Sequence, residues 1–143
     1  MAFNQRVTVA VMGVGFGLLL AAQSGETFKA RLSPLPADAR TRADLAGSGS
    51  ASAVLTGAKL AITGSFDGLR SAATTASLHS SAVPGIKGPA IGDLTIAKST
   101  SGTITGSIEL TPQQLASLRK GGLYVQIHSE KAPDGVLWGW LLR

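Results

Sequence analysis

The chain has 143 residues, of which 44% are hydrophobic, 15% charged and 5% aromatic, with 18 glycines and no cysteine. This length suits a single domain, the hydrophobic content argues against intrinsic disorder, and the absence of cysteine excludes disulfides, thiolate metal sites and cysteine nucleophiles. The net charge is +5, but the basic residues form no stripe interleaved with aromatic side chains, so nucleic-acid binding is not expected.

Residues 1–24 predict a secretory signal peptide. One basic residue precedes an apolar run over residues 7–22, and small residues follow it around a cleavage site before Gly25, with Gln23 as the second choice. The alternative is a retained membrane anchor, although the run is shorter than the ~20 residues that span a bilayer comfortably. We expect a cleaved signal, no transmembrane segment in the mature domain of residues 25–143, and a periplasmic or secreted location.

The first part of the mature domain predicts three strands. Alternating apolar residues over 28–32 predict the first strand, and a stretch rich in Pro, Ala, Asp and Arg over 33–48 predicts a long loop. Residues 50–55 and 59–66 predict the next two strands. The tripeptide at 56–58 contains a glycine and predicts a hairpin turn between them.

The middle of the chain predicts three more strands. Residues 74–80 predict a strand that ends in a loop over 81–89, which is rich in Pro and Gly. Residues 90–98 predict another strand, and a tight turn at 99–102 follows it. Residues 102–110 have the clearest period-2 pattern of the chain, with apolar side chains on one face and hydroxyls on the other.

The last part of the chain predicts one short helix and two strands. Thr111 is a suitable helix N-cap with Pro after it, and the helix is expected to end at the glycine pair 121–122. Residues 123–129 and 136–142 predict the strands, and the loop 130–135 joins them. About eight short strands with one short helix predict an all-β, antiparallel sandwich or barrel.

The chain has only two histidines, His79 and His128, each near the end of a predicted strand. Three interpretations are open: structural hydrogen bonds across adjacent strands or to the loop 81–89, a copper or zinc site, and general-base chemistry. Ser80 and Ser81 follow the first histidine directly, but there is no Gly-x-Ser-x-Gly elbow, so a catalytic triad is not predicted.

The residues from Val136 to Arg143 form the most apolar part of the mature domain. Strand periodicity places Trp138 and Trp140 on one face and the flanking leucines on the other. Either this strand is buried on both faces, or one tryptophan is exposed and anchors a partner.

Five stretches between Phe28 and Leu142 carry short motifs in a defined order. They are Phe28-x-Ala30-x-Leu32, Gly64-Ser65-Phe66-Asp67-Gly68-Leu69, Leu78-His79 followed by Gly85-x-x-Gly88-Pro89, Leu110-Thr111-x-x-Gln114 leading to Gly121-x-Leu123-Tyr124-Val125, and Ile127-His128-Ser129 followed by Pro133-x-Gly135-x-x-x-Gly139. Their order and spacing together resemble the CHRD domain family, which is named for its repeats in chordin.

The resemblance implies an extracytoplasmic all-β module for which no catalytic activity is established. It also implies a Greek-key layout similar to that of copper–zinc superoxide dismutase, which by itself carries no function. Family members often have His-x-His where this chain has Ser77, Leu78 and His79. At most two imidazoles, those of His79 and His128, therefore remain for a metal. Further candidate ligands are Asp93, Asp134 and Glu130.

We therefore expect residues 25–143 to form a CHRD domain, an antiparallel Greek-key sandwich or barrel. The expected function is a non-enzymatic binding or accessory module without a cofactor, which binds a protein in the periplasm or at the membrane surface as part of an extracytoplasmic complex. The partner-binding candidates are Trp138, Trp140 and Tyr124. The alternative is a copper- or zinc-binding or redox protein that uses His79 and His128.

Overall fold

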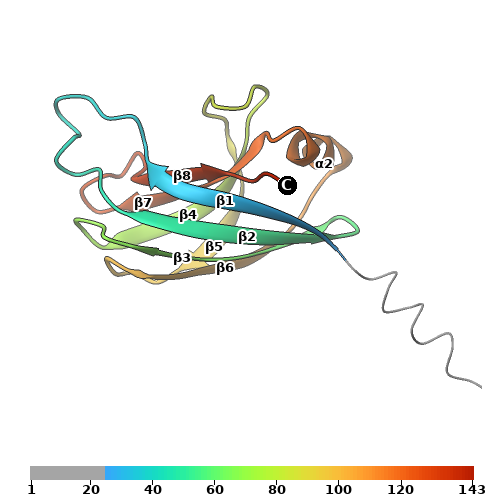
Figure 1. Ribbon diagram of the computed structural model, residues 1–143, viewed down its shortest axis with the longest axis horizontal. Coiled ribbons are helices and arrows are strands. Elements are labelled where there is room, and N and C mark those ends of the chain that lie inside the picture. The colour runs from blue at the N-terminus through green and yellow to red at the C-terminus, as the bar shows by residue number, and fades with distance from the viewer. Residues whose placement is uncertain (1–24) are drawn as a thin grey trace, which may run out of the picture.

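The computed structural model describes residues 25–143, which form eight strands and one short helix (Figure 1). The elements are β1 (Glu26–Pro34), β2 (Ser48–Thr56), β3 (Lys59–Asp67), β4 (Ala73–Ser80), β5 (Ala90–Ile96), β6 (Gly102–Glu109), α2 (Pro112–Arg119), β7 (Leu123–Ser129) and β8 (Leu137–Trp140). The predicted signal peptide, residues 1–24, lies outside the described residues. Within the described part, no helix has the length and apolar character needed to cross a membrane.

The strands form a closed, antiparallel barrel in the order β1-β2-β3-β6-β5-β4-β7-β8, and β8 returns to pair with β1. Strands β4, β5 and β6 follow one another by direct neighbour pairing, whereas β7 crosses over to lie beside β4. This 4-1-2-3 order of four antiparallel strands is a Greek key. The predicted fold class, an all-β Greek-key barrel of eight strands with one short helix, is confirmed.

All eight predicted strands are present, but several boundaries differ. The first strand runs from Glu26 to Pro34, longer than predicted, because the whole of β1 pairs with β2 or β8. The last strand is shorter than predicted and ends at Trp140, after which Leu142 makes only an isolated bridge to Lys29. Tertiary pairing therefore makes the first strand longer, and the last strand shorter, than the sequence predicts.

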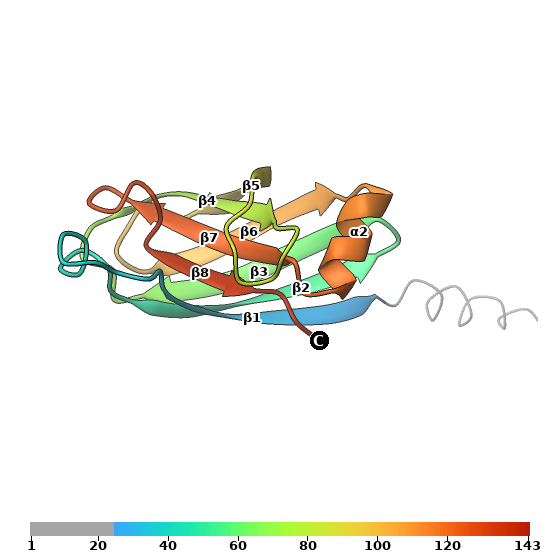
Figure 2. The same cartoon turned by 90° about the horizontal axis from the view of Figure 1, so that it is seen from above.

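The helix α2 begins as its sequence predicts. The Thr111 side chain accepts a hydrogen bond from the Gln114 backbone, and the Gln114 side chain accepts one from the Thr111 backbone, which completes a capping box. Pro112 occupies the first turn, where its missing N–H leaves no intrahelical bond unmade. Leu118 is buried in the core, so the helix is held against one end of the barrel (Figures 1 and 2).

The core is built from the inward side chains of every strand, together with residues from α2 and the loops. Its largest fully buried apolar side chains are Phe28, Leu32, Leu60, Ile62, Leu78, Ile104, Leu118, Leu123, Ile127, Leu137 and Leu141. Because strand side chains alternate between two faces, the remaining positions point out of the barrel. The barrel therefore has two broad outer faces, one over β2, β3 and β6 and the other over β4, β7 and β8.

Candidate functional site

The outer face of β4, β7 and β8 brings together both histidines and both tryptophans, and we call it the covered face. Strand register places Ser77 opposite Gln126 and His79 opposite Tyr124. It also places Tyr124 opposite Trp140 and Gln126 opposite Trp138. The covered face comprises Ser77, His79, Tyr124, Gln126, His128, Trp138 and Trp140. The predicted placement of the two tryptophans on one face is thus confirmed.

Two loops contact this face. The loop 81–89, yellow-green in Figures 1 and 2, stands over β7 and β8 and reaches the aromatic side chains through Gly88. The loop 130–135 folds back along β7 and reaches His128 through the Pro133 carbonyl. Because these loops remove side chains from water, polar groups on the covered face need partners within the protein.

Tyr124 is the buried centre of the covered face, with no exposed surface. Its hydroxyl accepts a hydrogen bond from the Gly88 N–H at 2.9 Å and donates one to the Gly88 carbonyl at 3.1 Å. An added Cβ at Gly88 would collide with the Ser80 and Ser81 backbone, so only glycine lets the loop approach this closely. Tyr124 therefore fastens the loop 81–89 to the sheet.

Four aromatic rings form a continuous cluster around Tyr124. The His79 ring stacks on Tyr124 with centroids 4.9 Å apart and planes 19° apart. Trp140 lies 4.4 Å from the Tyr124 centroid, and Trp138 meets both rings edge-on at 5.6 and 5.7 Å. Such distances suit favourable aromatic pairs and fix the orientation of the indoles.

Both tryptophans are half-buried. The last strand is therefore neither buried on both faces nor built around one fully exposed tryptophan. Leu137 and Leu141 fill the core, while Trp138 and Trp140 rest on the outside of the barrel with part of each indole open to solvent. Gly139 lies between them, and a Cβ there would meet the Arg31 carbonyl of β1. The glycine thus allows the close approach of β8 to β1.

His79 makes a hydrogen bond from each ring nitrogen. Its Nδ1 lies 2.9 Å from the Gly88 carbonyl and its Nε2 lies 2.8 Å from the Ser77 hydroxyl. A carbonyl only accepts, so Nδ1 carries the proton, and the neutral ring accepts the Ser77 proton at Nε2. Burial lowers the pKa of His79 below its usual value. The Gly88 hydrogen bond opposes this shift, whereas the charges of His128 and Lys87 reinforce it.

His128 repeats this arrangement on the neighbouring strand. Its Nδ1 lies 2.8 Å from the Pro133 carbonyl, and its Nε2 lies 3.3 Å from the Gln126 amide nitrogen. That amide nitrogen also donates to the Asp134 carbonyl at 3.2 Å, which fixes the amide orientation. The Gln126 side-chain oxygen is left buried without a hydrogen-bond partner.

The two imidazoles thus share one pattern. Each ring donates Nδ1–H to a loop carbonyl and directs Nε2 at a polar side chain, and those side chains, Ser77 and Gln126, are direct cross-strand partners. Of the two expected structural roles, His79 makes the hydrogen bond to the loop 81–89, whereas its other bond is to Ser77 on its own strand. A neutral imidazole held through Nδ1 also has the form in which histidine binds metals.

The chemistry available here is limited in two ways. Ser77 has the distance to His79 that proton transfer needs, but it is only 8% exposed and thus poorly placed to attack a substrate. No group of three His, Cys, Asp or Glu side chains within residues 25–143 lies close enough to hold a metal ion. Asp93, Asp134 and Glu130 therefore do not complete a ligand set with the histidines.

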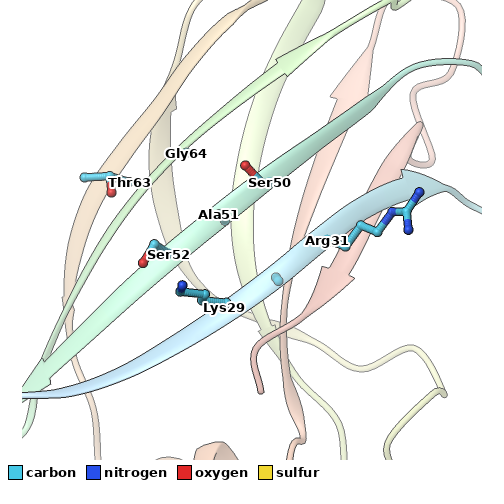
Figure 3. Close-up of a pocket in the computed structure, with 8 residues that line it drawn as sticks. Lys29, Arg31, Ser50, Ala51, Ser52, Thr63 and Gly64 are labelled. Atoms are coloured by element: carbon cyan, nitrogen blue, oxygen red, sulfur yellow. The ribbon is translucent and has the colours of Figure 1, made fainter. Parts of the chain in front are cut away.

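The opposite outer face, over β2, β3 and β6, carries a different chemistry, and we call it the hydroxyl face. Register aligns Ser50, Ser65 and Thr103 in one row and Ser52, Thr63 and Thr105 in the next. A hollow of about 610 Å³ lies here between Lys29 and Arg31 on β1 and the small side chains of β2 and β3 (Figure 3). The side chains that line the hollow are exposed or half-exposed, apart from the buried Ala30 and Ala51 beneath them. Lys29 and Arg31 are the only ionisable residues in this lining.

Sequence reasoning assigned no role to two of the residues that build the covered face, although periodicity groups Gln126 with Tyr124 and His128. Gln126 lies between Tyr124 and His128 in a strand whose alternate residues are all polar or aromatic, and that pattern alone marks it as a neighbour of the histidine. Gly88 was recognised only as part of a glycine loop, because its hydrogen bonds to Tyr124 join residues 36 positions apart.

In a comparison with protein families, residues 28–141 match the family model described as the CHRD domain. A search of curated proteins and a search of solved structures each found no match. The match includes residues of every strand of the barrel and the whole of the covered face.

Proposed function

Because this chain belongs to the CHRD domain family, a non-catalytic, binding-type domain, we propose that it is a binding or accessory module of an extracytoplasmic complex. In this proposal the domain is periplasmic or secreted after loss of residues 1–24. It contributes the covered face to a protein partner, which is soluble in the periplasm or resides at the membrane surface.

The observation that carries this proposal is the position of Trp138 and Trp140. Both indoles lie outside the core, half-exposed, side by side and held rigid by Tyr124. Rigid aromatic side chains with residual apolar surface are the most frequent energetic anchors of protein interfaces, since they bury a large area with little loss of conformational freedom. Tyr124 is itself buried, so in this arrangement it orients the indoles rather than touching the partner.

The experiment is co-purification of the exported protein from its native cells with two single variants, Trp138→Ala and Trp140→Ala. At least one variant is expected to lose the associated protein while it remains folded, because a half-buried ring contributes less than the roughly 3–5 kcal/mol of a fully buried one. Thr63→Ala on the hydroxyl face is the control and should retain the partner. Unchanged association in both tryptophan variants, with their folding verified by thermal melts, would contradict the proposal.

A second candidate function, copper or zinc binding, is favoured by a separate observation. The Nε2 atoms of His79 and His128 approach a paired serine and glutamine, and the buried oxygen of Gln126 has no partner. Two neutral imidazoles fit copper better than structural zinc, which takes three or four strong donors. When bound, the metal would supply Lewis-acid or redox chemistry, and His79 and His128 would hold it through Nε2.

Elemental analysis after dialysis against a mild chelator decides between the two functions. The first proposal expects no stoichiometric metal. About one equivalent of copper or zinc that is retained by the wild type and lost in His79→Ala or His128→Ala would favour the second. Ser77→His adds a third imidazole beside His79 and is expected to raise copper affinity if the two histidines form a metal site.

A further inference from the structure

We propose that the loop 81–89 and the adjoining surface of α2 form a docking site for an anionic phospholipid bilayer. In this arrangement the aliphatic tip of the loop enters the headgroup region, while lysines at its base contact lipid phosphates. This surface is separate from the tryptophans of the proposed function, and its test uses none of the same residues.

The first observation is the exposure of the loop tip. Val83 is 54% exposed and Ile86 is 59% exposed, and with Leu142 and Val54 they are the four exposed large hydrophobic residues of the described part. Pro84 lies between them and is exposed as well. The loop stands clear of the barrel in Figure 1, so its tip reaches a flat surface before the sheet does.

The second observation is that the tip is a hydrogen-bonded turn. The Ile86 N–H donates to the Val83 carbonyl at 3.2 Å, Pro84 occupies the second position, and Gly85 has φ +90° at the third. These features define a type II turn. The Ser81 hydroxyl donates to the Val83 carbonyl at 2.6 Å and braces the turn from its base.

The base of the loop is fixed to the barrel as well. The Ser80 N–H donates to the Pro89 carbonyl at 3.0 Å, the Ser81 N–H donates to the Gly122 carbonyl at 2.8 Å, and Gly88 is held by Tyr124 and His79. A loop that is ordered before it binds loses less conformational entropy on binding. The aliphatic tip is therefore displayed in a defined conformation rather than collapsed onto the core.

The third observation is the charge around the tip. Lys87 and Lys120 are exposed, and neither takes part in a salt bridge within the described residues. Lys120 lines a hollow of about 280 Å³ between the loop and α2. Residues 81–92 and 110–129 contain no Asp or Glu, so Lys120 faces only uncharged residues across its hollow. Lys87 also lines a second hollow with Asp38, Asp44 and Asp134 of other segments, but it forms no salt bridge with them.

These features together favour a bilayer over a protein or a second copy of the chain. Two aliphatic side chains on a narrow turn offer much less than the roughly 800 Å² per partner that a stable protein interface buries. Partial insertion of apolar groups adds directly to the attraction between lysines and anionic headgroups, so a small tip with a basic rim is sufficient for a membrane surface.

The test is co-sedimentation of the exported protein with vesicles of phosphatidylcholine alone and of phosphatidylcholine with one quarter phosphatidylglycerol. We expect binding to the anionic vesicles only, with loss at 0.5 M salt, where charges more than a few ångströms apart are screened. Equal binding to neutral vesicles, through residues 1–24 or any other segment, would overturn the proposal, as would no binding to either.

Two double variants then locate the contact. Val83→Ser with Ile86→Ser is expected to lower the vesicle partition coefficient about tenfold or more, because the inserted apolar area is removed. Lys87→Glu with Lys120→Glu is expected to lower it by at least fivefold per residue. The matched controls are Val54→Ser and, for charge, Lys29→Glu with Lys98→Glu. They make similar changes away from the loop and should bind as the wild type does. Equal loss in variants and controls would refute a local site.

The absence of cysteine allows a direct readout of insertion. A single Ile86→Cys variant that carries an environment-sensitive fluorophore should show a blue shift on anionic vesicles, and the same label in a Val54→Cys variant should not. A shift at both positions, or at position 54 alone, would mean that another surface meets the lipid. Retained co-purification of the protein partner in the Val83 and Ile86 variant keeps this result separate from the proposed function.

Discussion

The two outer faces of the barrel differ in how they treat polar side chains. On the hydroxyl face, Ser50, Thr63 and Thr105 point to solvent, and water satisfies their hydroxyls. On the covered face, Ser77 and Gln126 are buried and depend on protein partners for their hydrogen bonds. The same period-2 alternation produces both faces, so it is the loops above β7 and β8 that turn one of them into a site.

This difference sets the energetic expectations for substitution. An exposed hydroxyl binds water in the folded and in the unfolded chain alike. Its removal therefore changes the free energy of unfolding by only about ±0.5 kcal/mol. Buried polar and aromatic groups lose packing or leave a partner unpaired, which is several times more unfavourable. Comparing the loss of stability caused by variants on the two faces therefore shows how much the covered face contributes to the stability of the fold.

The largest expected effect comes from truncation after Gly135. This change removes β8 with the buried Val136, Leu137 and Leu141 and opens the barrel between β1 and β7. The loss is expected to exceed the whole stability of a small domain, about 5–15 kcal/mol. Circular dichroism should show no cooperative melt. A truncated chain that still melts cooperatively near the wild-type temperature would contradict the closed barrel.

The next effect is that of Tyr124→Ala at the centre of the covered face. The substitution removes a fully buried ring that contacts His79 and both indoles, so we expect a loss of about 3–5 kcal/mol in the free energy of unfolding. Thr63→Ala, its counterpart on the hydroxyl face, should stay within about 0.5 kcal/mol of wild type. Denaturant unfolding of both variants measures the two losses in the free energy of unfolding. Equal losses would contradict the difference between the two faces.

Tyr124→Phe is a finer test, because it keeps the ring and removes only the hydroxyl. The Gly88 N–H and carbonyl then lose their Tyr124 partner, which is expected to lower stability by about 1–3 kcal/mol. Amide exchange of the loop 81–89 should accelerate more than that of β4. Unchanged exchange in the loop would show that the hydroxyl does not fasten it.

The smallest effect is a pH dependence contributed by His79. Its folded-state pKa lies below the usual 6.5, mainly through burial, so the unfolded chain takes up the proton first as the pH falls. Stability is therefore fully present above pH 6.5 and declines as the pH drops from 6.5 toward the lowered folded-state pKa. Urea unfolding across this window should show the decline in wild type and a weaker decline in His79→Gln. Glu26 and Asp38, whose pKa values are lowered by hydrogen bonds, act only at more acidic pH.

The sequence predicted every strand of the barrel because alternation of apolar residues is a local signal. It also predicted the cap of α2, since Thr111, Pro112 and Gln114 act within one turn. The pairing of Ser33 with Trp138, which closes the barrel, joins the two ends of the domain and has no local signature. For the same reason, the contact between Gly88 and Tyr124 could not be predicted.

The sequence named the histidines, the tryptophans and Tyr124 as candidates, but it carried no information on how they are arranged. Each histidine lies in a predicted strand, yet the partners that orient the rings, Gly88 and Pro133, come from loops whose paths depend on tertiary contacts. The intermediate burial of Trp138 also depends on how closely β8 approaches β1, which Gly139 permits but does not by itself specify.

The central claim, that the covered face and not the hydroxyl face meets the partner, is tested most directly by oxidative footprinting of the protein. The protein is labelled once within its native complex and once after purification. The account predicts that Trp138 and Trp140 are protected from oxidation in the complex, while peptides that contain Thr63 and Thr105 are labelled equally in both states. Protection of the hydroxyl face with unprotected tryptophans would contradict it.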